Sequence, residues 1–442
     1  MIRRLSTVLL VAGLGLAAPA AAQTPSPLTL TQAIARARAQ NPEAGSAAAA
    51  EREAAERLIQ ARAGYFPKVD FTESWQRGNL PVFVFGSLLA QRQFTAADFA
   101  LAALNHPDAV NNFRAGLTVE QSLFDGATRA NVRAAGIGRD LTAAGRLLVD
   151  QRLSQSVTDA YGRVLMATAT VRSVAAAVET ARADRELAGN RRDAGLVTDA
   201  DVLQLDVYMA RTLEQQVQAT AEERIARARL NQLIGEPLGT VFMLEPVVPT
   251  AAGVAADSAT LEAEAVKNRP EVTLATLQEQ LARAAVTAAR ASFLPQVSAQ
   301  GGWELNGGGW NSRASSWVVG AVARINLFHG FADQSRLAEA REQATRRGLE
   351  RGQAETAARL DVQIALARLD AARASEAVGR AAADQARESR RIIRDRYESG
   401  LTDAASLLRA AEAVQGAETQ QIAAQVNVLT ATAALERAMG KR

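Results

Sequence analysis

The sequence predicts an α+β protein built from two copies of one half, in which long β-strands are followed by α-helices of unusual length. Three observations support this fold class. Short motifs recur at a nearly constant distance along the chain. Four segments alternate apolar and polar residues with the period of a strand. Two segments, 127–190 and 331–399, contain no proline and carry apolar or small residues at coiled-coil spacing.

The recurring motifs divide the chain into two halves, and they exclude a solenoid, whose period would be about 20 to 50 residues. Residues 61–69 return at 289–297, a shift of 228, whereas Leu123 to Gly126 return as Leu327 to Gly330, a shift of 204. The shift therefore falls by 24 residues between the two motifs. We infer that the first half carries an insertion, which lies between Gly78 and Val110.

The first 22 residues have the pattern of a cleaved secretory signal. Arg3 and Arg4 precede an apolar stretch at 8–16, which is too short for a membrane anchor, and Ala20 to Ala22 fit a cleavage site. The mature chain is expected to begin near Gln23. Beyond the signal peptide at 1–22, we expect a first structural repeat at 23–235, an inter-repeat linker at 236–260 and a second repeat at 261–442.

Composition and motifs give no support for an enzyme. The 50 basic residues are offset by 47 acidic ones, which predicts a mixed-charge surface and no nucleic-acid partner. Cysteine is absent, so no thiol nucleophile exists. His106 and His329 have no companions at ligand spacing, and neither a metal site nor a catalytic triad is expected. The glycines at 301–302 and 307–309 lack the lysine of a phosphate loop and are expected in a hairpin loop. No cofactor is predicted.

Each half is expected to begin with a helix that ends before a proline. Pro42 suits the first helical position, residues 43–63 are helix formers, and Pro67 ends the segment. Residues 261–291 repeat this pattern before Pro295.

Four alternating segments then predict strands of membrane-crossing length. Each has about ten residues or more, whereas most strands have about five or six. A change of register by one residue would turn Arg114 and Arg324 toward lipid, at about 2–4 kcal/mol each near the midplane. A soluble sheet with one buried face is the alternative. All four tryptophans lie on or beside these segments, as in an interfacial belt: Trp75, Trp303, Trp310 and Trp317.

Four strands cannot close a membrane barrel, because at least about eight are needed. An open sheet edge in hydrocarbon would leave backbone groups unpaired at several kcal/mol each. Several chains must therefore complete the barrel. Two copies give eight strands with little lumen, and three copies give 12 strands that can enclose water, so we expect a trimer in contact with outer-membrane lipid.

The long helices reach almost 100 Å at about 1.5 Å per residue, a length that spans a periplasm. Gly195 and Gly400 can adopt the left-handed conformation that ends a helix. Helices that return to Gly235 and Gly440 should follow. The oxygens offered as N-caps for these returning helices belong to Thr198, Asp199, Thr402 and Asp403.

A signal peptide, a tandem duplication, two strands per half, Leu-Phe-x-Gly before a long helix and a Gly-Leu tip before a returning helix together resemble the TolC-like outer membrane efflux proteins. The similarity extends from about Leu28 to Gly440. It implies a homotrimer with a 12-stranded outer-membrane β-barrel, continued by a periplasmic coiled-coil tunnel of 12 helices. A mixed equatorial region would include the linker. Such proteins are exit ducts that a periplasmic adaptor couples to an inner-membrane pump, and they have no catalytic site.

The hairpin tips are the candidate docking site for the adaptor, because each exposes a small residue and an apolar one. The alternative is that the glycines only satisfy the turns. The expected docking residues are Gly195, Leu196, Thr198, Gly400, Leu401 and Thr402.

A gate at the closed tunnel end is the second candidate site. By the resemblance, Tyr397 matches a tyrosine of the family's closed end and Asp201 an acidic partner, whereas Ser406 and Arg409 stand where carboxylates are often found. Ordinary helix packing is the alternative for Tyr397. The pairs expected to hold the end shut join Arg394, Arg396 or Arg409 to Asp199, Asp201 or Asp403.

Passive export of small toxic compounds is the predicted function. Type I protein secretion and a non-conducting periplasmic coiled-coil scaffold are the alternatives. The insertion between Gly78 and Val110 is expected to be an external loop, which either folds inward and constricts the barrel mouth or packs laterally.

Overall fold

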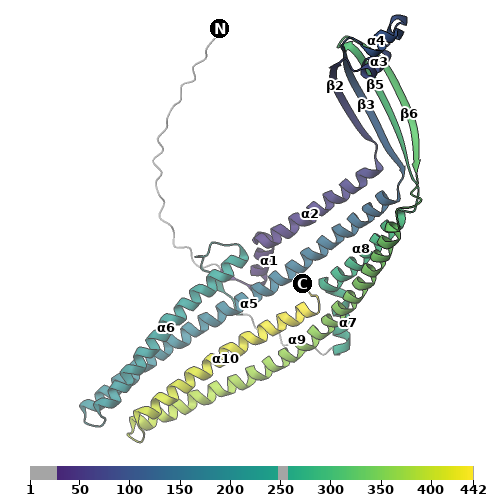
Figure 1. Cartoon of the computed structure of the whole chain (residues 1–442). Coiled ribbons are helices and arrows are strands. Elements are labelled where there is room, and N and C mark those ends of the chain that lie inside the picture. Colours follow the sequence, from purple (N-terminus) through teal and green to yellow (C-terminus); the bar gives the residue numbers. More distant parts are fainter. Residues whose placement is uncertain (1–26, 247–256, 442) are drawn as a thin grey trace, which may run out of the picture.

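The computed structural model describes residues 27–246 and 257–441 (Figure 1). The predicted signal peptide and residues 247–256 of the predicted linker lie outside this part of the chain. Figure 1 shows one sheet at one end of a long helical bundle, and two helical hairpin tips at the other end.

The sheet has four antiparallel strands, and their order is β2-β3-β5-β6. The apolar positions point to one face and most polar positions to the other, as predicted. The two hairpins share one register: Trp75 lies opposite Phe113, and Trp303 lies opposite Trp317, at positions related by the sequence repeat. The strands span Lys68–Gly78 (β2), Val110–Phe124 (β3), Gln296–Gly309 (β5) and Ser312–Arg324 (β6).

Two details of the strands differ from expectation. The glycines at 301–302 and 307–309 lie inside β5, and the hairpin turn is only Trp310 and Asn311. Glycine weakens a strand, but here β6 supplies hydrogen-bonding partners beside it. The alternation of apolar and polar residues continues in the sequence to Leu327, but the last strand ends at Arg324, because Arg324 faces Gln296, the first residue of β5.

Two helices run almost the whole length of the bundle: α5 (Gly126–Asp193) with 68 residues and α9 (Ala332–Glu398) with 67. At about 1.5 Å per residue each is about 100 Å long. The returning helices are α6 (Asp199–Ile234) and α10 (Ala404–Ala438), which pack on α5 and α9. By length and composition α5 also contains a stretch apolar enough to cross a membrane. Only 22% of that stretch is buried within the described chain, although α5 packs on α2, α6, α8 and α10.

The initial helix of each half is interrupted by its proline. In the first half, α1 (Leu30–Gln40) ends one residue before α2 (Pro42–Arg62) begins, and in the second half α7 (Ser258–Asn268) and α8 (Pro270–Ala291) are divided in the same way. The C-terminal end of a returning helix packs against each of these breaks. A Cβ atom on Gly235 would lie 2.7 Å from Gln40 Cβ, and one on Gly440 would lie 2.7 Å from the carbonyl carbon of Asn268.

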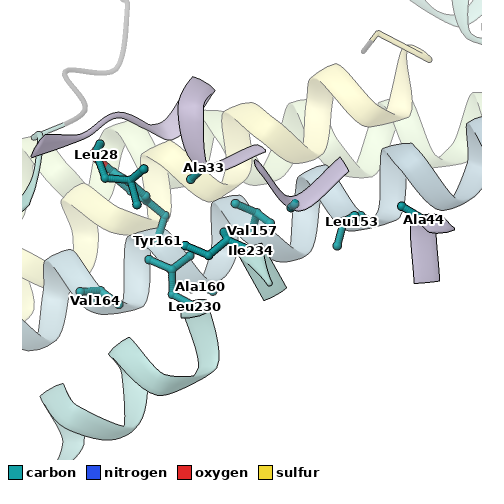
Figure 2. Packing of buried hydrophobic residues seen from close by; sticks show 11 residues of the cluster. Leu28, Ala33, Ala44, Leu153, Val157, Ala160, Tyr161, Val164, Leu230 and Ile234 are labelled. Atoms are coloured by element: carbon teal, nitrogen blue, oxygen red, sulfur yellow. The ribbon is translucent and has the colours of Figure 1, made fainter. Parts of the chain in front are cut away.

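A buried cluster at mid-length joins the start of the described chain to the linker (Figure 2). The short strands β1 (Pro27–Leu28) and β4 (Met243–Leu244) pair in parallel beside α5. The hydroxyl oxygen of Tyr161 lies 2.8 Å from the carbonyl oxygens of both Leu28 and Glu245, and its proton is donated to one of them at a time. Removal of this phenol from water raises its pKa to about 12.

The insertion of the first half is folded. It contains α3 (Pro81–Ala90), a 3-10 turn η2 (Ala96–Phe99) and α4 (Leu101–Asn105). These elements lie at the end of the sheet that is far from the bundle (Figure 1).

Candidate functional site at the hairpin tips

Both tips turn through the same backbone motif. Gly195 and Gly400 have a φ of +74°, in the left-handed region that favours glycine. The following residues, Leu196 and Leu401, donate their N–H groups to carbonyl oxygens five residues earlier, each at 2.8 Å. This pattern is a Schellman motif. It leaves the leucine side chains 65% and 68% exposed at the extreme end of the bundle.

The returning helices begin at side-chain caps. Thr198 and Asp201 form a capping box: the Thr198 N–H donates to Asp201 Oδ2 at 2.9 Å, and the Asp201 N–H donates to Thr198 Oγ1 at 3.3 Å. At the other tip, Asp403 accepts from the Ser406 N–H at 2.9 Å. Hydrogen bonds from Ser406 lower the pKa of Asp403, which stays ionised as a cap. Asp199 and Thr402 are not caps: Asp199 is the first residue of α6, and Thr402 precedes the cap of α10.

Tyr397 is buried to 1% exposure near the end of α9. The guanidinium of Arg191, on α5, stacks over its ring at 5.1 Å and donates to the carbonyl oxygens of Tyr397 and Glu398 at 2.6 and 2.7 Å. Burial raises the pKa of Tyr397, opposed by Arg191 and assisted by the carboxylates of Asp201 and Asp184. The tyrosine is therefore enclosed where the two halves meet, close to the acidic residues of the first half.

The predicted gate pairs do not form within the described chain. Arg394 lies 3.2 Å from Glu398 and 3.9 Å from Asp184, and Arg409 donates to Ser406 Oγ at 2.9 Å. The carboxylates at 201 and 403 already serve as helix caps, and Asp199 lies 3.8 Å from Arg192. Arg396 contributes its carbonyl oxygen to the turn at Leu401. Pairs between protomers stay a prediction.

Asp184 is the charged residue that sequence reasoning missed. It is 2% exposed on α5, and its Oδ2 accepts from the Arg390 guanidinium of α9 at 3.0 Å. Its spacing in the sequence could have identified it, since Asp184 lies on the same buried face of α5 as Ala181 and Ala188. A buried ion pair loses hydration, but removal of one partner leaves a costly uncompensated charge. The pair therefore holds the first and second halves together just above the tips.

The tips combine helix caps with exposed apolar side chains. In the described residues, no cluster of histidine, aspartate and glutamate could hold a metal ion. The groups gathered here are caps, one enclosed phenol, one buried ion pair and two exposed leucines, which is an arrangement suited to contact with another protein.

Comparison with known proteins agrees with this architecture. The model of the outer membrane efflux protein family matches residues 33–236 and 261–441. Protein CyaE from Bordetella pertussis is 30% identical over 341 residues, which are 76% of this chain and 72% of the relative. The Campylobacter jejuni CmeC outer membrane channel has a TM-score of 0.80 at 16% identity and covers 93% of this chain and 85% of its own. The outer membrane protein VceC from Vibrio cholerae has a TM-score of 0.76 at 19% identity, over 93% of this chain and 96% of its own. The chain belongs to the outer membrane efflux protein family, and its location is the outer membrane.

Proposed function

We propose that three copies of the chain form an outer-membrane exit duct, in which a 12-stranded barrel is continued by a periplasmic tunnel. One observation carries the proposal: a single chain contains both long strands of a sheet and helices that continue from that sheet. Strands with one apolar face lead directly into helices about 100 Å long. Conduction from the tips to the cell exterior, without catalysis, suits this continuity. Small compounds delivered by an inner-membrane pump and a periplasmic adaptor are the proposed cargo.

The open edges of the sheet support the trimer. Within residues 27–246 and 257–441, strands β2 and β6 each have one neighbouring strand, so their outer edges lack backbone partners there. In the hydrocarbon of a membrane those edges need strands from other copies. Native mass spectrometry in detergent should give a trimer, and a monomer alone would contradict the proposal.

Conductance tests the duct directly. The variant carrying Tyr397→Phe and Asp201→Ala should show a larger single-channel conductance in planar bilayers than the unaltered protein, because Asp201→Ala removes the capping box that fixes the start of α6 at the tip. Insertion of intact trimers without any conductance in either form would favour the scaffold alternative. An unchanged conductance in the variant would place the closure elsewhere. If a secreted protein disappears from the medium of cells that lack this chain, that protein is the cargo instead of small compounds.

The exposed leucines are the proposed adaptor contact. Leu196→Asp with Leu401→Asp should abolish export while the trimer still assembles, since both side chains are exposed and pack little in the chain. Leu238→Asp is the matched control, because Leu238 is also exposed in a turn but follows α6 far from the tips. Retained export in the double variant would refute this contact.

A further inference from the structure

The insertion in the first half lies on the polar face of the sheet, where α3 contacts β3 and β5. The Gln91 amide at the end of α3 donates to the carbonyl oxygen of Asn111 at 2.8 Å and to Asn112 Oδ1 at 3.1 Å. Asn112 in turn donates to Asn306 Oδ1 at 3.1 Å. Both asparagines are buried and share their face with the ion pair of Arg114 and Glu304. This face is the one that would line an aqueous lumen.

Contacts with the two outer strands, β2 and β6, also place the insertion on the polar face of the sheet. A Cβ atom on Gly78 in β2 would lie 3.6 Å from Phe83 of α3, and Gly78 belongs to the polar face. Beyond the end of α3, Arg92 donates to the carbonyl oxygen of Ser315 in β6 at 2.9 Å. The insertion thus crosses all four strands of the sheet. These contacts place the insertion over the polar face of the sheet and not over its apolar face.

Several large apolar side chains of the insertion are exposed. Val84 and Ser87 of α3 are buried against their surroundings, whereas Val82 is 81% exposed. The rings of Phe85, Phe94 and Phe99 pack edge to face, with centroids 4.8 and 5.0 Å apart, and hold η2 against α3. We call the exposed residues the mouth patch: Leu80, Val82, Leu89, Phe99 and Leu101.

An apolar patch on the water-facing side of a barrel needs a partner. We propose that the mouth patch packs against the same patch of two other copies on the three-fold axis, which forms an apolar plug in the mouth of the barrel. This inference rests on the proposed trimeric duct. Lipid cannot reach the polar face of a closed barrel, and an axial patch in a cyclic trimer meets its own copies. The insertion occurs once per chain, so the plug has three parts.

Cross-linking tests the plug without any need for conduction. The chain contains no cysteine, so Val82→Cys and Leu101→Cys each introduce a single thiol. Treatment of intact trimers with a short flexible bismaleimide should join two chains through either site. Asn311→Cys is the matched control, because it is exposed in the β5–β6 turn at the rim and should stay unlinked. Thiols at 82 and 101 that react with a monofunctional maleimide but give no linked chains would overturn the plug.

Conductance provides the second test. Residues 80–107 are replaced by a short glycine-containing turn in the background of Tyr397→Phe and Asp201→Ala, so that the tips do not limit the current. The shortened protein should conduct several-fold better than the same background with the insertion. If the deletion fails to assemble, Val82→Asp with Leu89→Asp should give a similar increase through repulsion, whereas Asn311→Asp should not. Equal conductance would refute the plug, and absence of current in every assembled form would refute the duct while the cross-links still decide the plug.

Discussion

Each returning helix ends close to the point where a proline interrupts the initial helix of its half. This close approach predicts that substitution by alanine destabilises the chain more at Gly235 than at Gly195. Gly235 and Gly195 have φ values of +75° and +74°, so a Cβ atom should cost about 1–2 kcal/mol at either position. Space around Gly195 is open, whereas a Cβ on Gly235 would lie 2.7 Å from Gln40 Cβ and 3.1 Å from its carbonyl oxygen. Forcing an additional carbon into a packed site costs about 1–3 kcal/mol more. Gly235→Ala should therefore destabilise the chain by about 2–5 kcal/mol, and Gly195→Ala by about 1–2 kcal/mol.

Thermal unfolding of the detergent-solubilised protein, followed by far-ultraviolet circular dichroism, measures this difference. Because such unfolding is commonly irreversible, the variants are compared at one heating rate. The second half provides an independent pair, since a Cβ on Gly440 meets the backbone at Asn268, whereas on Gly400 it meets only the end of the Arg191 side chain. Equal decreases of the unfolding temperature within both pairs would refute the packing argument.

Three further changes should affect stability in ways that the structure specifies. Tyr161→Phe should cost about 1–3 kcal/mol in the same unfolding experiment, because the carbonyl oxygens of Leu28 and Glu245 lose the hydroxyl proton that they share. Since the pKa of Tyr161 is raised from 10.0 to about 12, the unfolded chain releases this proton first, and stability should fall between those pH values in the unaltered protein but less in the variant. Thr198→Ala should cost about 0.5–2 kcal/mol and accelerate amide hydrogen exchange in the first turn of α6, and unchanged exchange would contradict the capping role. Asp184→Ala should cost about 3–5 kcal/mol, and adding Arg390→Met should recover much of the loss; a second loss of equal size would mean that the pair is not coupled.

Sequence reasoning succeeded where the determinants are local. The ends of α5 and α9 follow from Gly195 and Gly400, and the starts of the returning helices follow from caps within three residues. The glycines of β5 were misplaced because local propensity disfavours glycine in strands, while the pairing that overrides it comes from β6. The choice between an inward and a lateral insertion was open for the same reason, since it depends on Gln91 reaching Asn112.

The candidate site shows the same division. The turn glycines and caps at the tips could be found from short motifs, but Arg191 contacts Tyr397 across about half the chain and no local pattern predicts it. Within the described chain the carboxylates near the tips accept hydrogen bonds from the backbone N–H groups of Thr198 and Ser406, which compete for them at short range, and pairs between protomers stay a prediction.

The shared register of the two hairpins has a consequence for the seams between copies. The pairing of β2 with β3 corresponds, through the sequence repeat, to the pairing of β5 with β6. The proposed trimer would therefore have pseudo-sixfold symmetry, with six equivalent hairpins from three chains. The β3–β5 seam inside the chain is then the pattern for the β6–β2 seam between chains. The pair of Arg114 and Asn306 in the chain corresponds to a pair of Val318 with Gly78 of the neighbouring copy. The pair of Glu120 and Gln300 corresponds in the same way to a pair of Arg324 with Thr72 of the neighbouring copy. In a barrel assembled in this way, the seams between chains would have the same backbone hydrogen-bonding pattern as the seam within each chain.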